Sequence, residues 1–170
     1  IRSCLVGSEM CIRDSYFLVA RRADSQLTFD IDLALQKNNE NPVYYIQYAH
    51  ARICSALRNA IEKYHSIDRP LGLTQLAQLS SDSELALAKL IESYPEKVAA
   101  ASRETAPHVI AGYLRDLAAT VHAWYATGNQ DPSALWLVDN DALRNARVWL
   151  AVAAKVSSTS GLDLRGVGAR

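Results

Sequence analysis

The chain has 170 residues, enough for one domain with a proper hydrophobic core. Its content of 49% hydrophobic and 21% charged residues is typical of a globular domain, and no apolar run approaches the roughly 18 residues that a membrane-spanning helix needs. Basic and acidic residues number 18 each, so the formal net charge is zero, which argues against a free-standing, strongly basic nucleic-acid binder. Three cysteines give no disulfide framework and indicate a reducing, cytosolic compartment.

Residues 1–15 do not fit the rest of the chain. They are too short and too charged for a secretory signal, and no helical stripe connects them to Tyr16. We interpret them as a non-native leader, because VGSEMCIRDS resembles a string found at broken reading-frame ends in environmental assemblies. Residues 16–40 read as a connector: a short apolar helix end, a polar turn at 23–26 and a short amphipathic piece. Its Phe29, Ile31 and Leu33 are expected to dock on the domain that begins at residue 41.

The segment 41–65 predicts one long amphipathic helix. Asn41 can cap its first backbone N–H groups, and Pro42 suits the first helical position. An apolar stripe follows helical spacing: Ile46, Ala49, His50, Ile53, Leu57, Ala60 and Tyr64. The opposite side carries Tyr45, Tyr48, Arg52, Ser55, Asn59 and Lys63. Tyrosines and an arginine about one turn apart can stack on a planar group and hold a phosphate. Alternatively, the tyrosines flank the core with their hydroxyls in water.

Two shorter helices are predicted next. Pro70 and Gly72 should break the helix. Residues 66–82 are therefore expected to form a surface loop that ends in a helix cap at Ser80–Asp82. The segment 83–94 then predicts a helix with Leu85, Leu87, Leu90 and Ile91 facing inward. Pro95 starts a further helix that stops before Pro107.

Two long helices complete the prediction. The first runs over 107–127 and is ended by Gly128, with an apolar stripe of Ile110, Tyr113, Leu114, Leu117, Val121, Trp124 and Tyr125. The second is capped by Asp139 or Asp141, runs to about Val156 and is closed by Gly161. No segment alternates with a period of two residues. The sequence therefore predicts an all-α bundle of about five main helices.

Residues for catalysis or metal binding are not evident. The sequence has no HIGH-type or KMSKS-type string and no glycine-rich phosphate loop. His50 and Cys54 are four residues apart, but no second Cys/His pair completes a tetrahedral zinc site, so a buried, hydrogen-bonded histidine beside a core cysteine is expected. His108 and His122 are interpreted as structural. We predict no catalytic and no metal-binding residue.

Several long strings carry a family resemblance. NENPVYYIQYAHARICS (39–55) closely resembles the helix that opens the anticodon-binding domain of arginyl-tRNA synthetases, named the DALR domain after letters that also occur at Asp141–Arg144. RRADSQLTFDIDLA (21–34) is similar to the segment after the family's KMSKS loop. The 93–128 segment resembles the family's FPE and APHxxxxYLxxLAxxFHxFY pattern, and 146–167 resembles its closing ARLxLxxAxxxVLxxGLxLLGV.

The resemblance implies that residues 41–170 bind a tRNA for arginine, not DNA or a membrane. Sequence-specific RNA recognition mostly targets unpaired loop bases, and every arginine tRNA has C as its middle anticodon base. The family's tyrosines matching Tyr45 and Tyr48 help bind the anticodon loop. Arg52 would contact phosphate or hold its helix against the last helix, and Trp136 and Trp149 are weaker candidates that core packing explains equally well.

The resemblance also implies a parent enzyme, cytoplasmic arginine–tRNA ligase, that uses arginine and ATP with magnesium. This chain would be its carboxy-terminal third, without the active site and without a cofactor of its own. The family ending GLxLLGVxAPxxM reads GLDLRGVGAR here, so the final residues are expected to be missing. Two alternatives remain: the bundle of another class I synthetase such as the cysteinyl enzyme, and a helical scaffold whose exposed tyrosines bind a protein.

Overall fold

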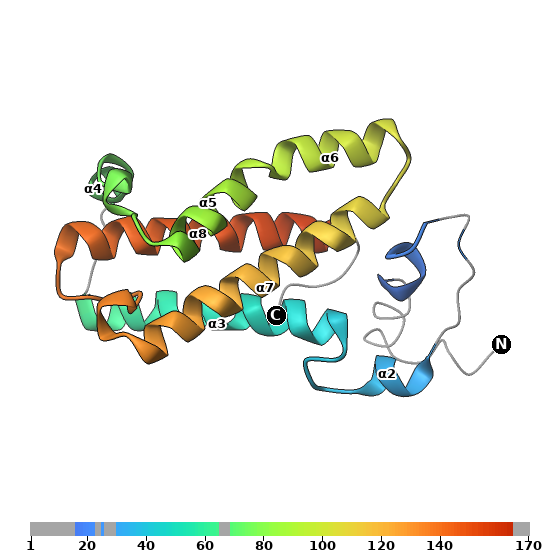
Figure 1. Cartoon of the computed structure of the whole chain (residues 1–170), viewed down its shortest axis with the longest axis horizontal. Coiled ribbons are helices and arrows are strands. Elements are labelled where there is room, and N and C mark those ends of the chain that lie inside the picture. The colour runs from blue at the N-terminus through green and yellow to red at the C-terminus, as the bar shows by residue number, and fades with distance from the viewer. Residues whose placement is uncertain (1–15, 23–24, 26–29, 65–68, 165–170) are drawn as a thin grey trace.

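All regular structure in the part of the chain that the computed structural model describes, residues 16–22, 25, 30–64 and 69–164, is helical, as predicted (Figure 1). Five helices of ten or more residues form the main body: α3 (Pro42–Tyr64), α5 (Asp82–Glu92), α6 (Tyr94–Arg103), α7 (His108–Gln130) and α8 (Asp141–Asp163). Shorter pieces are α2 (Ile31–Leu35), α4 (Arg69–Thr74) and the 3-10 turns η1 (Leu76–Gln78) and η2 (Pro132–Ala134). Residues 1–15, and with them the predicted leader, lie outside the described residues.

Helix α7 is the centre of the bundle. It contacts α3, α5, α6 and α8, and Figure 1 shows it running diagonally between α3 on one side and α5 and α6 on the other. Its predicted stripe is buried from Ile110 to Trp124, and Leu114 is fully inaccessible. The stripe of α3 packs against it through Ile46, Ala49 and Ile53. Burial of these side chains, at about 1.5–3 kcal/mol for each large aliphatic or aromatic group, holds the three long helices together.

The start of α3 is fixed as the sequence predicts. The Oδ1 atom of Asn41 accepts hydrogen bonds from the backbone N–H groups of Val43 and Tyr44, at 3.0 and 3.3 Å. Its amide group donates to the carbonyl oxygens of Ala34 and Gln36, at 3.0 and 2.9 Å. Asn41 itself is completely buried, and its bonds to Ala34 and Val43 are buried as well. One side chain thus caps α3 and ties α2 to it. Of the predicted docking residues, Leu33 is half-buried, and nothing is described of the side chains of Phe29 and Ile31.

Three predictions about glycine are wrong for one reason. Helix α7 continues past Gly128 to Gln130, α8 continues past Gly161 to Asp163, and Gly72, which is expected from the sequence to break a helix, lies inside α4. A Cβ atom at Gly161 would lie 2.7 Å from Leu114 Cδ2, and one at Gly72 would lie 2.0 Å from Trp149 Cδ1. Gly161 and Gly72 therefore allow close packing between helices, and at Gly128 a Cβ atom would lie 3.3 Å from the Ala134 carbonyl oxygen of η2. As a result the predicted 66–82 loop contains α4 and η1, which pack on α8.

Two further details differ from the prediction. Leu85 is 42% exposed, whereas Leu87 is fully buried and Leu90 and Ile91 are half-buried, so only part of the predicted α5 stripe faces the core. The cap of α8 is Asn140, whose side chain accepts from Leu143 N, and not Asp139 or Asp141. The cap of α5 agrees with the sequence, because Ser81 and Glu84 form a complete capping box.

Candidate nucleic-acid interface

The predicted polar face of α3 is organised by Arg52. Its Nη2 atom donates to the hydroxyl oxygen of Tyr48 at 3.0 Å, and its guanidinium carbon lies 4.3 Å from the centre of the Tyr48 ring. The ring of Tyr125, from α7, lies 4.7 Å from the same carbon. A guanidinium between two tyrosine rings is held by cation–π attraction as well as by the hydrogen bond. Arg52 thus fixes two aromatic rings from different helices in one arrangement.

His122 completes this arrangement from α7. Because arginine can only donate, the 2.8 Å contact from Arg52 Nη1 requires His122 Nδ1 to be an unprotonated acceptor. The proton then lies on Nε2, which donates to the Tyr45 carbonyl oxygen at 3.2 Å. Burial lowers the pKa of His122 below its ordinary value of 6.5. The hydrogen bond to Tyr45 opposes this, and the charge of Arg52 lowers the pKa further. The imidazole is therefore held neutral at pH 7.

Aromatic rings extend the cluster along α3. The His122 ring lies 4.6 Å from the Tyr45 ring and 5.5 Å from the Tyr48 ring, measured between centroids. Tyr44 stacks on the outer side of Tyr48 at 6.0 Å with an interplanar angle of 19°. Tyr48 itself is 39% exposed, so one part of its ring remains available to a ligand.

A pocket of about 490 Å³ opens beside this cluster. It lies between the middle of α3, the last turns of α7 and the segment after η2. Its lining comprises Tyr48, Ala51, Arg52, Ser55, Ala56, Asn59, Tyr125, Gly128, Asn129, Leu135, Trp136 and Leu137. The volume suits a small planar group, the aromatic rings offer stacking faces, and Ser55, Asn59 and Asn129 offer hydrogen bonds. This combination fits a single unpaired nucleobase.

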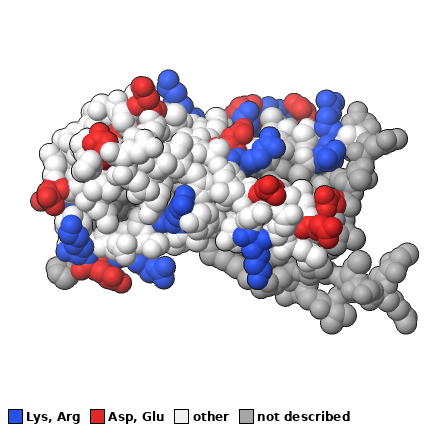
Figure 2. Space-filling model, turned by 60° about the horizontal axis from the view of Figure 1, so that its bottom comes forward, with Lys and Arg blue, Asp and Glu red and all other residues white. Residues whose placement is uncertain are grey.

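The charge on this side of the molecule is dispersed. Figure 2, which brings the lower side of Figure 1 forward, shows basic and acidic side chains interspersed, some of them side by side, with uncharged surface between the groups. A basic stripe that would follow a nucleic-acid backbone is not visible on this face of the described residues. Recognition here would therefore depend on the pocket more than on the number of phosphate contacts.

Comparison with known families identifies the domain. The profile of the family described as the DALR anticodon binding domain matches residues 46–169, which include the whole pocket. The chain belongs to the DALR anticodon-binding domain family. The match begins within α3 and extends beyond the end of α8, so this helical bundle is the DALR fold of the chain.

Relatives of this DALR domain are arginine–tRNA ligases. Those of Bordetella petrii and Burkholderia ambifaria are 47% and 44% identical to it over 154 residues, or 91% of this chain. The solved arginyl-tRNA synthetase of Thermus thermophilus has a TM-score of 0.79 and 32% identity over 96% of this chain. The chain spans only about a quarter of these proteins, 26% and 25% of the two ligases and 26% of the solved structure. These relatives favour the arginyl enzyme over the cysteinyl one.

The DALR bundle gathers the predicted site residues only in part. Tyr45, Tyr48 and Arg52 lie together, but Arg52 joins α3 to α7 and not to the last helix, so that part of its predicted role is wrong. Trp136 is buried and stacks on Trp124 at 4.1 Å, and it forms the inner wall of the pocket. Trp149 lies against Gly72 of α4 and does not line the pocket. Whether these residues bind RNA stays a prediction.

Sequence reasoning misses three residues of the cluster. It interprets His122 as structural, places Tyr125 in the apolar stripe of its helix and does not single out Tyr44. The sequence HAWY (122–125) does contain a signal, because His122 and Tyr125 are three residues apart and therefore share a face of their helix. Only the packing of α3 on α7 shows that this face meets Arg52.

His50 is buried and hydrogen-bonded, as predicted, whereas Cys54 is half-buried and not part of the core. Ser158 donates its hydroxyl proton to the Lys155 carbonyl oxygen, so His50 Nδ1 must donate to Ser158 Oγ at 2.8 Å. The thiol of Cys54 then donates to His50 Nε2 at 3.4 Å. Burial, followed by the charge of Lys155, lowers the pKa of His50. Among the described residues there is no group of three or more His, Cys, Asp or Glu that could hold a metal ion, and no helix long and apolar enough to cross a membrane.

Proposed function

We propose that this chain recognises the anticodon loop of a tRNA for arginine, as the anticodon-binding part of an arginine–tRNA ligase. The observation that carries the proposal is the pocket between Tyr48, Arg52, Tyr125 and Trp136, which lies within the matched DALR region. An unpaired base from the loop would enter the pocket and stack on the exposed part of Tyr48. Tyr45, which is half-buried against His122, would support this surface from behind.

Arg52 has a defined part in this proposal. Its charge is already shared with two tyrosine rings and a histidine, so it contributes orientation more than free positive charge. A phosphate beside the bound base could still accept a hydrogen bond from it. Trp136 contributes the inner wall. Trp149 is the weakest of the five candidate residues, because it contacts α4 on a part of α8 outside the pocket.

The parent protein would supply the chemistry. We propose that the complete protein attaches arginine to its tRNA with ATP and magnesium in the cytoplasm, since the arginine–tRNA ligases that this chain resembles are about four times longer. The 170 residues contain neither a HIGH-type nor a KMSKS-type string, so this chain alone should bind tRNA without charging it.

Competition with a small RNA tests the proposal. The full chain would be titrated with labelled arginine tRNA, and the isolated anticodon stem–loop would be added as competitor. We expect the stem–loop to displace the tRNA. The same stem closed by a short, stable loop of unrelated sequence is the control and should not compete. Equal competition by both RNAs, or by neither, would contradict anticodon-loop recognition.

A further inference from the structure

The inner wall of the pocket is a short segment, Leu135–Leu137, that hydrophobic packing alone cannot position. Leu135 is 43% exposed, and the Nε1 atom of the buried Trp136 has no hydrogen-bond partner among the described residues. Stacking on Trp124 and an edge-on contact with Tyr125 orient the Trp136 ring, but these ring contacts leave the backbone carbonyl groups of the segment to be held by polar contacts. The position of the wall therefore depends on the polar contacts of its backbone.

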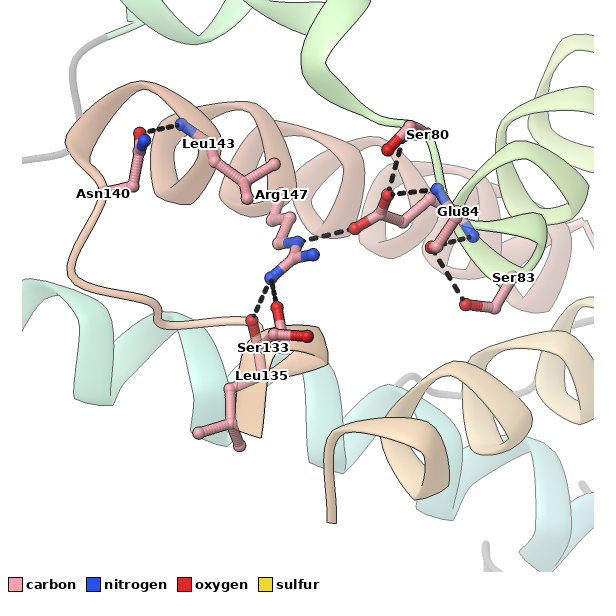
Figure 3. A network of polar contacts seen from close by, with 9 residues as sticks. Ser80, Ser83, Glu84, Ser133, Leu135, Asn140, Leu143 and Arg147 are labelled. Carbon is pink, nitrogen blue, oxygen red and sulfur yellow. Dashed lines mark hydrogen bonds and ion pairs between the residues drawn. The ribbon is translucent and has the colours of Figure 1, made fainter. Parts of the chain in front are cut away.

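Arg147 makes those contacts at the start of the wall. From the buried face of α8, its Nη1 atom donates to the carbonyl oxygens of Ser133 and Leu135, at 2.8 and 2.6 Å (Figure 3). At the other end, the hydroxyl group of Tyr64 donates to the Leu137 carbonyl oxygen at the longer distance of 3.4 Å. The backbone N–H of Leu135 donates to the Pro132 carbonyl oxygen at 3.4 Å, so Arg147, with its two charge-assisted bonds, is the strongest of the described attachments.

Glu84 fixes Arg147 in turn. Its Oε1 atom accepts from Arg147 Nε at 2.5 Å, and its Oε2 atom accepts from the backbone N–H groups of Ser80 and Ser81, both at 3.1 Å. The side chains of Glu84 and Arg147 are only 1% and 6% exposed. Figure 3 shows the resulting chain of contacts, which runs from the start of α5 through α8 to the segment after η2. Both carboxylate oxygens of Glu84 and the Nε and Nη1 atoms of Arg147 therefore have hydrogen-bond partners, and a buried polar network of this kind holds a rigid geometry.

The wall has almost no room to move towards α7. A Cβ atom at Gly128 would lie 3.3 Å from both the Ala134 carbonyl oxygen and Leu135 Cα. The backbone of the wall therefore rests directly on the last turn of α7, while Arg147 holds it from the α8 side. These two contacts set the width of the pocket between Trp136 and Tyr48.

We propose that Glu84 and Arg147 are positioning residues for base recognition. The buried ion pair fixes the position of the Leu135–Leu137 wall, which lies against the anticodon base, and the pair itself makes no contact with RNA. This inference rests on the proposed function. It predicts that changes at these two buried sites alter base selectivity as well as affinity. A residue that only stabilised the fold would change the fraction of folded protein and leave the selectivity of the folded molecules intact.

The double variant E84Q/R147M is the main test. Removing both charges avoids a buried unpaired ion, so the fold should persist, whereas the Ser133 and Leu135 carbonyls lose their donor. We expect affinity for arginine tRNA to fall about tenfold and the preference for C over G at the middle anticodon position to fall with it. In a W149F background, only Trp124 and Trp136 contribute to tryptophan emission. Displacement of the wall should then shift this emission to longer wavelength.

Two further variants complete the design. E96Q/R103M removes the exposed Glu96–Arg103 pair of α6 and should leave affinity, preference and emission unchanged. R147K keeps the charge but cannot bond both carbonyls and Glu84 together, so it should retain the fold and lose part of the preference. If E84Q/R147M does not fold, the same three measurements on R147K (affinity, base preference and tryptophan emission) test the positioning role.

The outcomes separate this inference from the proposed function. Wild-type selectivity and emission in folded E84Q/R147M, or in R147K if the double variant does not fold, would overturn the positioning role. A wild-type chain with no preference for C would instead contradict the proposed function. In that case the emission shift alone would still test whether Arg147 positions the wall.

Discussion

Tyr48 is the residue that the proposed recognition depends on most. Its ring is stacked on Tyr44 on one side, covered by the guanidinium of Arg52 on another, and partly open to solvent at the pocket. Such a ring is already held in place before RNA arrives, so stacking a base on it costs little side-chain entropy. Stacking energy and not fold stability should therefore decide the effect of changing it.

Replacement of Tyr48 by alanine should weaken binding of arginine tRNA by about 1–3 kcal/mol, the usual contribution of one base stack. The exposed position of the ring predicts only a small change in the free energy of unfolding. Titration of fluorescent tRNA measures the affinity. Tyr48→Phe is the matched control: it keeps the stacking face and loses only the contact with Arg52 Nη2. Equal affinity in wild type and Tyr48→Ala would remove Tyr48 from the site.

Two histidines, the buried His50 and the half-buried His122, predict an acid-sensitive fold. His50 and His122 have pKa values below the ordinary 6.5 in the folded state, so below that pH the unfolded chain binds more protons than the folded one. The free energy of unfolding should therefore be independent of these two groups above about pH 7 and should decrease as the pH drops from 6.5 towards 5. Thermal unfolding followed by circular dichroism at several pH values measures this.

A variant at His122 tests how much of this pH dependence comes from that histidine. His122→Asn can still accept from Arg52 or donate to the Tyr45 carbonyl but does not titrate, so its melting temperature should depend less on pH in this window. The exposed-site change Glu104→Gln is the control and should leave the dependence as in wild type. A wild-type melting temperature that rises on acidification from pH 7 to 5 would show that the sign is wrong.

At the scale of helices, close contacts at glycine set the packing distances. Sequence reading locates the long helices and their buried stripes because these repeat every three or four residues. It misplaces helix ends at Gly128 and Gly161, because a glycine needed for contact with another helix looks the same as one that ends a helix. The partner of Gly161, Leu114, is about fifty residues away in the sequence, so this contact cannot be read locally.

Gly161→Ala should destabilise the bundle. The added Cβ atom would lie 2.7 Å from Leu114 Cδ2, and the fully buried Leu114 has little room to give way, so a cost of about 1–3 kcal/mol in the free energy of unfolding is expected. Gly112→Ala in α7 is the control, since a Cβ atom there would meet nothing within 4 Å. It should stabilise the protein by about 0.4–1 kcal/mol. Urea unfolding measures both, and an unchanged or raised stability of Gly161→Ala would contradict the packing role.

The pocket itself could be predicted only in part. Tyr45, Tyr48 and Arg52 share a face of one helix, so periodicity and the family string locate them. The opposite side of the pocket comes from Tyr125 and from Leu135–Leu137, and it depends on how α7 ends and turns into α8. That turn is held by Arg147 and Glu84, which are 63 residues apart. No local pattern predicts a bond between them.

At the scale of the whole molecule, a net charge of zero predicts weak salt dependence. Binding through one pocket and about three phosphates should give a slope of about −2 in a plot of log affinity against log salt, since each single-strand phosphate contributes about −0.7. Titrations of arginine tRNA over a series of potassium chloride concentrations measure it. A slope several times steeper would indicate an extended backbone interface and contradict recognition centred on the pocket.

Selectivity for the middle anticodon base is the most direct test of the account. The full chain would be titrated with an arginine tRNA transcript and with the same transcript carrying G in place of C at the middle anticodon position. We predict clearly tighter binding of the C form, by about tenfold, and loss of that preference in Tyr48→Ala. Equal affinity for the two transcripts would contradict the claim that the pocket beside Tyr48 reads the anticodon.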